Sequence, residues 1–225
     1  LYGAHGTSHQ YVSQRTAELC GKNVEDMNII TCHLGNGASI TAVKGGKCIN
    51  TSMGLTPLGG IMMGTRSGDL DPTVVFYMMK KLNCTPDEMD TWLNKKSGML
   101  GVSGISSDAR DIGEAVANGN ERAILTQKLY VNRVINVIGG YFMQLGHVDA
   151  IAFTAGLGEN DVALRGMILE ALSEGMGLSI DYELNNKTRG KEVCISKPDS
   201  KVAVWICPTN EELVIARDTA RILGL

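Results

Sequence analysis

The residues with the clearest potential for chemistry lie at 29–43, where Gly35, Asn36 and Gly37 separate two apolar runs. The pattern predicts two strands joined by a tight turn, because Asn-Gly favours the positive-φ turn of a hairpin. Glycine lets backbone N–H groups approach a ligand, so such a turn can present donors to phosphate oxygens without a P-loop lysine. His33 and Asn36 would add side-chain donors. Taken alone, the pattern also fits an ordinary hairpin.

A second glycine string, residues 153–160, follows an apolar run and precedes a helical pattern; it contains Gly156, Leu157, Gly158 and Asn160. Ligands of α/β proteins bind beyond the carboxyl ends of strands, where this string would lie. The string is incomplete as a dinucleotide fingerprint and no acidic residue follows at the required distance, which argues against a Rossmann site. A nucleoside or phosphate pocket and a plain strand–helix turn both remain open.

Arg66 is the single arginine in a loop of small residues at 63–72. Its guanidinium suits bidentate binding of phosphate or carboxylate. The structural alternative is an ion pair with Asp69 or Asp71 that holds the loop in shape.

Two histidines, His5 and His9, stand near the start of a predicted helix, where they could donate to an anion or cap the helix. Ser8 and His9 are not a nucleophile–base pair, because neighbours on a helix do not face each other. His33 has no partners at the spacing of zinc ligands. Glu211 and Glu212 open the last predicted helix, either as favourable charge at its N-terminus or as a magnesium ligand or water orienter.

The elements that must position these residues follow from hydrophobic periodicity, caps and glycine stops. Strands are expected at 29–34, 38–43, 47–51, 150–154 and 201–207, with helices at 7–19, 72–82, 86–95, 108–116, 121–145, 161–176 and 210–223. Residues 52–71 form an irregular loop. Because hairpins come first and strand–helix alternation follows, we expect a mixed α/β sheet with helices on its faces.

Composition narrows the classes of function. The 225 residues are 44% hydrophobic and 20% charged, as in a soluble globular protein. The net charge of −3 argues against general attraction to nucleic acid or to an anionic membrane. No secretion signal or membrane-spanning run is visible, and six cysteines without zinc spacing suggest reduced thiols in a cytoplasmic protein. The chain starts at Leu1, and we expect an N-terminal truncation.

Together these strings resemble the acetate kinase family. The matching segments are residues 5–9, 33–37, 51–58, 63–72, 156–160 and 208–212. The resemblance covers the whole sequence, but only the C-terminal part of the family's longer chain. It implies a ribonuclease-H-like fold of the actin, Hsp70 and sugar kinase superfamily. Residues 1–208 would be the second nucleotide-binding domain, and 209–225 a terminal helix that packs on the missing first domain.

The family transfers the γ-phosphoryl group of ATP reversibly to acetate, giving acetyl phosphate and ADP, with Mg²⁺ or Mn²⁺. By resemblance, Arg66 would neutralise charge on the phosphoryl group being transferred and would orient the acetate carboxylate. His5 would donate a hydrogen bond to the equatorial oxygens of that phosphoryl group, and His33 would hold the γ-phosphate of ATP. The remaining roles are phosphate binding by Asn36 and Gly37, adenosine binding by Asp108, Ala109, Arg110, Gly156, Leu157, Gly158 and Asn160, metal binding by Glu211, and an acyl pocket at Pro57 and Ala4. A homodimer is also implied, and the long helix at 121–145 is a candidate for its interface.

Two residues depart from the family's pattern. Ala4 stands where many members carry Phe, which predicts a larger acyl pocket and a propionate-preferring kinase as the alternative. Ala109 replaces a bulkier residue, which loosens the nucleoside assignment. A different class of function is a non-catalytic nucleotide-binding or dimerisation module. Because half of the cleft would be missing, we expect little turnover from this chain alone.

Overall fold

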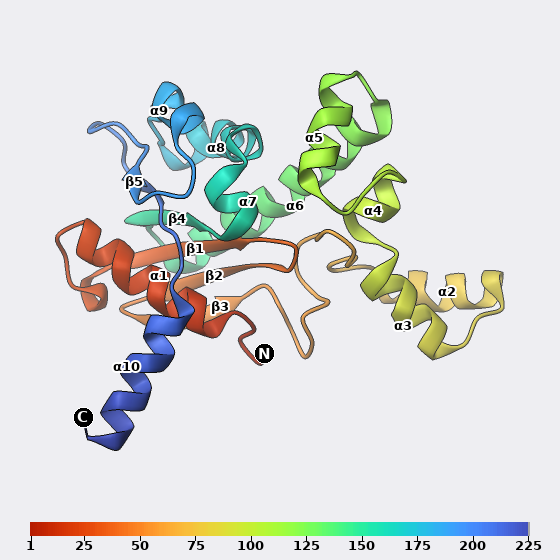
Figure 1. The fold of residues 1–225 in the computed structure, drawn as a ribbon, viewed down its shortest axis with the longest axis horizontal. Coiled ribbons are helices and arrows are strands. Elements are labelled where there is room, and N and C mark those ends of the chain that lie inside the picture. Colours follow the sequence, from red (N-terminus) through yellow and green to blue (C-terminus); the bar gives the residue numbers. More distant parts are fainter. Residues whose placement is uncertain (225) are drawn as a thin grey trace.

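The centre of the molecule is a six-stranded mixed sheet in the order β3-β2-β1-β4-β6-β5, in a computed structural model that describes residues 1–224 (Figure 1). The strands are β1 (Asn28–Leu34), β2 (Ala38–Lys44), β3 (Lys47–Thr51), β4 (Ala150–Thr154), β5 (Val193–Cys194) and β6 (Ala203–Ile206). β1, β2 and β3 form an antiparallel meander, whereas β4 runs parallel to β1 and β6 runs parallel to β4.

The pairing of β1 with β4 decides where the two glycine strings meet. His33 stands opposite Thr154 in the parallel register, so both strands end at one edge of the sheet. The 35–37 turn follows β1 at that edge, and residues 155–160 follow β4. Segments more than a hundred residues apart in sequence are therefore side by side, as ligand sites of α/β sheets require.

The helices begin and end at residues of the expected types. Asp71 caps α2 through the Thr73 N–H, Thr85 and Glu88 form a capping box on α3, and Asn210 caps α10. The helices are α1 (Gly6–Leu19), α2 (Pro72–Leu82), α3 (Pro86–Lys95), α4 (Gly98–Ser103), α5 (Ala109–Ala117), α6 (Glu121–Leu145), α7 (Ala155–Asn160), α8 (Val162–Met176), α9 (Tyr182–Lys187) and α10 (Glu211–Leu223), with a 3₁₀ turn at Val24–Asp26.

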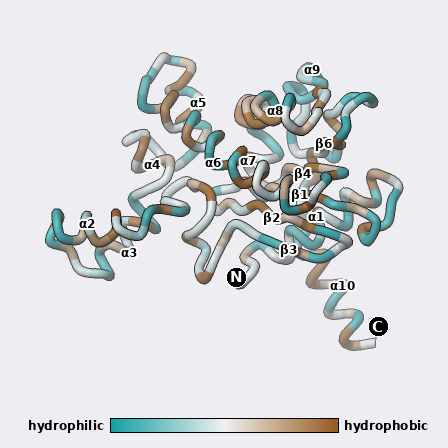
Figure 2. The backbone as a smooth tube through the Cα atoms, turned by 180° about the vertical axis from the view of Figure 1, so that it is seen from behind, coloured by the Kyte–Doolittle hydropathy of each residue, from teal (hydrophilic) through white to brown (hydrophobic). Residues whose placement is uncertain are grey.

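Each face of the sheet buries alternate strand residues under helices. One face, with Ile30, Cys32 and Phe153, packs with α6 and α8 in the largest apolar cluster. The other face carries Ile29 and Ala152, in two smaller clusters that include residues of α1. Seen from behind, the apolar segments gather around β1, β4 and α8 (Figure 2). α10 contacts α1 and extends away from the sheet (Figure 1).

The predicted α/β class with a mixed sheet is confirmed, and so is each predicted strand and long helix to within a few residues. The plain turn considered for residues 155–160 is wrong, because these residues form α7. Sequence analysis also missed α4, α9 and β5, which are six, six and two residues long. Elements this short carry too few apolar repeats to show a period. Within residues 1–224, no helix combines the length and apolarity that crossing a bilayer needs.

We expect Ile138→Ala to destabilise the fold by about 2–5 kcal/mol, because Ile138 is fully buried between α6 and the sheet and its loss leaves a cavity. Leu125→Ala, on the exposed side of the same helix, is the matched control. Urea unfolding followed by circular dichroism measures both. Equal losses of stability in the two variants would contradict the packing described above.

Candidate functional site

The glycines of the 35–37 turn allow neighbouring groups to pack closely against its backbone, and they are not needed for a positive φ angle. Gly35, Asn36 and Gly37 all have negative φ, so the positive-φ hairpin turn expected from Asn-Gly is wrong. Space explains the glycines instead. A Cβ on Gly37 would lie 3.0 Å from Nη1 of Arg66, and one on Gly35 would lie 3.1 Å from the Gly37 carbonyl oxygen. A side chain at either position would push against the residues that flank the turn.

His5 and His33 both turn a ring nitrogen toward this turn. Their rings stack with centroids 4.0 Å apart and an interplanar angle of 17°. Nε2 of His5 would lie 3.6 Å from a Cβ on Gly37, and Nε2 of His33 would lie 3.9 Å from one on Gly35. His5 reaches this place from the N-cap of α1, in left-handed conformation with φ of 62°. Such strain in a non-glycine residue often marks a functional position.

The Nδ1 atoms of both histidines are held from behind by hydroxyl groups. Ser8 Oγ lies 2.8 Å from Nδ1 of His33, and Ser39 Oγ lies 2.8 Å from Nδ1 of His5. The same Ser39 oxygen lies 2.7 Å from Nε2 of His9, whose Nδ1 is 2.7 Å from Thr31 Oγ1. Sequence analysis gave His9 only a general role and missed Ser39 altogether. The sole signal for Ser39 was its place beside the turn, at the register position opposite His33.

Burial keeps these imidazoles neutral. It lowers the pKa of His9 to about 3, with smaller contributions from His33 and His5. Burial, and then the charge of His5, lowers the pKa of His33 to about 4. The pKa of His5 is also lowered by burial, an effect opposed by Glu211 and reinforced by Arg66. Each ring therefore offers one N–H donor and one acceptor at neutral pH, rather than two donors.

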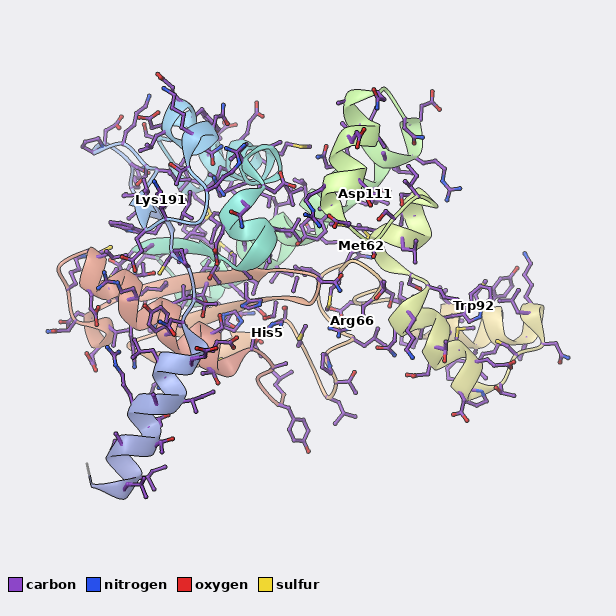
Figure 3. The ribbon with its side chains drawn as sticks, in the orientation of Figure 1. His5, Met62, Arg66, Trp92, Asp111 and Lys191 are labelled. Atoms are coloured by element: carbon purple, nitrogen blue, oxygen red, sulfur yellow. The ribbon has the colours of Figure 1, made fainter. Side chains whose placement is uncertain are left out.

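Arg66 approaches the same part of the turn as His5, since its Nη1 and the Nε2 of His5 lie 3.0 and 3.6 Å from one Cβ position on Gly37 (Figure 3). Nη1 of Arg66 approaches the Pro57 carbonyl oxygen at 3.5 Å and Met63 Sδ at 3.7 Å. The ion pair considered as an alternative is wrong: Asp69 accepts from the Gly60 N–H and Asp71 from the Thr73 N–H. Among the residues that the structure describes, no carboxylate lies within 4.0 Å of this guanidinium.

The Arg66 loop is irregular but firmly held. The Met63 N–H donates to the Arg66 carbonyl at 3.1 Å, and the Ser97 N–H donates to the Thr65 carbonyl at 2.9 Å. The Met99 N–H donates to the Met63 carbonyl at 2.8 Å. Backbone bonds to α4 and its N-terminal flank thus substitute for regular structure in positioning the charge.

A cavity of about 690 Å³ opens beside the turn, between α5 and the α7–α8 segment. The predicted residues that line it are Asn36, Ala109, Arg110, Gly156, Leu157 and Asn160, joined by Gly35, Gly113, Asp161, Val162, Ala163 and Arg189. The volume is in the range of small-molecule sites. Sequence analysis did not single out Arg189, which follows a helix too short to be recognised.

Other predicted residues lie outside this cavity. Asp108 caps α5 and pairs with Arg110 at 2.5 Å, which lowers its pKa to about 2. Gly158 is buried, with its Cβ position 3.4 Å from the Phe153 carbonyl carbon and 3.5 Å from the Cys32 carbonyl oxygen, so it lets α7 sit close to the sheet. Ala4 lines a separate cavity of about 300 Å³ beside His9.

Glu211 is exposed at the first position of α10, and its charge acts on His5. No group of three or more His, Cys, Asp or Glu side chains comes together as a metal site within residues 1–224. A lone carboxylate suits Mg²⁺, which binds through one or two carboxylates, substrate phosphates and water. Glu211 would therefore supply one carboxylate to a divalent metal whose remaining ligands are a bound phosphate and water.

The buried histidines predict a loss of stability in acid. Because their pKa values are about 3 and about 4 in the folded protein and 6.5 otherwise, the unfolded chain binds more protons between pH 6.5 and 4. Stability is fully present above pH 6.5 and falls as the pH is lowered through this window. We expect His9→Gln to lose less stability than the unaltered protein between pH 7 and 4.5, as measured by urea midpoints. Parallel pH profiles would show that His9 is not buried in its neutral form.

Known relatives are similar across nearly the whole chain. The sequence is 57% identical over 223 residues to acetate kinase from Dictyoglomus turgidum and 57% identical over 222 residues to that from Methanosarcina barkeri. These alignments cover 99% of the chain but 55% and 54% of the relatives. The chain thus spans about half the length of the curated relatives it matches.

Solved structures with a similar fold point to the same family as the sequence relatives. The fold is similar to acetate kinase from Porphyromonas gingivalis, with a TM-score of 0.94 and 48% identity over 97% of this chain and 55% of the other. It is also similar to a propionate kinase from Francisella tularensis, with a TM-score of 0.89 and 41% identity over 96% and 54% of the two chains. The expected fold class is confirmed. Since the family model matches residues 1–217, the chain belongs to the acetokinase family.

Proposed function

We propose that this chain is part of an enzyme that transfers the γ-phosphoryl group of ATP to acetate and catalyses the reverse reaction. The observation that carries the proposal is the convergence of His5, His33 and Arg66 on the 35–37 turn, whose Gly35 and Asn36 line the cavity of about 690 Å³. Membership of the acetokinase family and the acetate kinase names of its relatives support the same reaction.

In this proposal the phosphates lie against the turn and the adenosine occupies the cavity. Asn36 and the Gly37 amide bind phosphate oxygens, and His33 holds the γ-phosphate. The nucleoside contacts Ala109, Arg110, Gly156, Leu157 and Asn160, which line the cavity. Asp108 and Gly158 act without contacting the nucleotide. Asp108 holds Arg110 through an ion pair, and Gly158 lets α7 pack close to the sheet.

The transfer is a displacement at phosphorus. An acetate oxygen forms a bond to the γ-phosphorus, and the bond to the bridging oxygen breaks, so that ADP leaves with the electron pair. Little covalent help is needed, because positioning and charge stabilisation supply most of the catalysis. Arg66, which has no carboxylate partner in the described part of the chain, neutralises the transferring group and orients acetate near Pro57 and Ala4.

The hydroxyl network sets the proton that His5 presents. If Thr31 donates to Nδ1 of His9, then Nε2–H of His9 donates to Ser39, and Ser39 donates to Nδ1 of His5. Nε2 of His5 then carries the proton and faces the turn, ready to donate to an equatorial phosphoryl oxygen. Glu211 would hold the divalent metal, Mg²⁺ or Mn²⁺, which neutralises phosphate charge when bound.

Three wider expectations belong to the same proposal. The chain would be the second of two domains, with α10 packing on the first; the exposed Ile215, Ile222 and Leu223 of α10 are consistent with such a contact. The enzyme would be a homodimer, with the exposed face of α6 a candidate interface. A cytoplasmic location is supported by the six free cysteines of the described residues.

The reaction is tested with the complete gene product that carries this sequence, by hydroxamate formation from acetate and ATP. We expect activity in the unaltered protein and a loss of about 10²–10³ in kcat in Arg66→Ala, the scale of removing one transition-state donor. Lys197→Ala, which removes an exposed charge from the segment between β5 and β6, is the control.

An unaltered complete protein without activity would refute the proposal. The 225-residue chain alone is expected to turn over little. If the complete protein binds ADP without any turnover, the alternative of a non-catalytic nucleotide-binding module is correct.

A second candidate is a preference for propionate, favoured by the small side chain of Ala4 and by the similarity to a propionate kinase. One methylene is worth only about 1–3 kcal/mol of discrimination, so one side chain can decide it. We expect Ala4→Phe to lower kcat/KM for propionate relative to acetate by about tenfold, measured in the same assay. An unchanged ratio would place Ala4 outside the acyl pocket.

A further inference from the structure

Arg189 is a cation at the cavity that the proposed reaction does not use. It follows α9, and its exposed side chain lines the same cavity as Gly156, Leu157 and Asn160. In the described part of the chain its guanidinium makes one long hydrogen bond, from Nη1 to the Asn186 carbonyl oxygen at 3.3 Å. Within residues 1–224, no carboxylate lies within 4.0 Å of this guanidinium, whereas Arg110 across the cavity is paired with Asp108.

The backbone that carries Arg189 is fixed although it is irregular. A second arginine, Arg165, is 1% exposed and donates through Nη2 to the carbonyls of Asn185 and Thr188, at 3.1 and 3.0 Å. Its Nη1 donates to the Gly158 carbonyl in α7 at 2.8 Å. This buried guanidinium thus joins the segment before Arg189 to the helix that forms the cavity wall.

A further bond ties the residue after Arg189 to the same helix. The Gly190 N–H donates to the Glu159 carbonyl at 3.3 Å. The backbone is thus fastened to α7 on both sides of Arg189, through the Arg165 guanidinium before it and directly after it. A ligand that it contacts therefore pays little entropy for ordering the loop.

α7 shows which end of the cavity Arg189 occupies. Its first residue, Ala155, has its Cβ 3.6 Å from a Cβ on Gly35, at the turn assigned to the phosphates. Its last residue, Asn160, has Oδ1 3.6 Å from a Cβ on Gly190. From Ala155 to Asn160 the helix rises about 7.5 Å, so the backbone of Arg189 lies away from the phosphate turn. The nucleoside would occupy this end.

We propose that Arg189 binds the nucleoside part of the nucleotide, with its guanidinium plane against the base. The inference rests on the proposed function, since it takes the cavity to be the nucleotide site. A planar, weakly hydrated cation stacks on an aromatic ring, and lysine does not replace it in this role. Arg189 is thus a residue that determines nucleotide affinity and takes no part in phosphoryl transfer.

The test measures binding by calorimetry in the complete gene product, with ADP and with pyrophosphate as a probe that lacks the nucleoside. We expect Arg189→Ala to weaken ADP binding roughly 5- to 20-fold and to leave pyrophosphate binding and kcat at saturating ATP unchanged. Arg189→Lys should resemble Arg189→Ala, because the charge remains and the plane is lost. Lys191→Ala, an exposed charge two residues on, is the control and should bind ADP normally.

Two results would overturn the inference. If Arg189→Ala binds ADP as tightly as the unaltered protein, Arg189 does not contact the nucleotide. If it weakens ADP and pyrophosphate equally, or if Arg189→Lys restores binding, the side chain acts on the phosphates through its charge. A failure of the unaltered protein to bind ADP would instead refute the proposed function, which keeps the two claims separable.

Discussion

The parallel pairing of β1 with β4 is the constraint on which the site depends. It ends two strands at one edge of the sheet and so places the 35–37 turn beside the start of α7. Both strands are fully or almost fully buried, between α1 on one face and α6 with α8 on the other. A slip of one residue would turn each apolar side chain to the opposite face, so the core itself holds the register. The geometry of the site is therefore a consequence of the packing of the sheet.

Close approach is the recurring device around that edge. Gly64 is an example: a Cβ there would lie 2.2 Å from Oδ1 of Asn36 and 2.9 Å from the Ser107 carbonyl oxygen. Gly98 is another, with its Cβ position 2.2 Å from the Met63 carbonyl oxygen. Glycines at these places let the Arg66 loop, the turn and the segment before α5 converge. Their value lies in the side chains they omit, and only in part in the backbone angles they permit.

Two buried polar networks support the site from behind. His9 joins Thr31 to Ser39, and Arg165 joins α7 to the end of α9. Burying such groups costs free energy unless their hydrogen bonds are made, and both networks satisfy that requirement. Arg165 achieves it with an amide and three carbonyl oxygens and no carboxylate, and burial lowers its pKa to about 10. These networks restrict the orientations of the groups that face the cavity.

The sequence by itself determined the local elements and the residue types of the site. Periodicity and caps predicted the strands and long helices, and the glycine strings with His5, His33 and Arg66 marked the chemistry. The tertiary structure decided which of these residues meet, because contacts between distant segments leave no local pattern. Ser39, His9, Arg165 and Arg189 acquire their roles through partners in other elements, most of them 20 or more residues away, or through a cavity formed by several elements. The tertiary structure also explains the glycines of the turn. Their backbone angles are open to any residue, but a Cβ at Gly37 would crowd Arg66, which is distant in sequence and could not be identified from the local pattern.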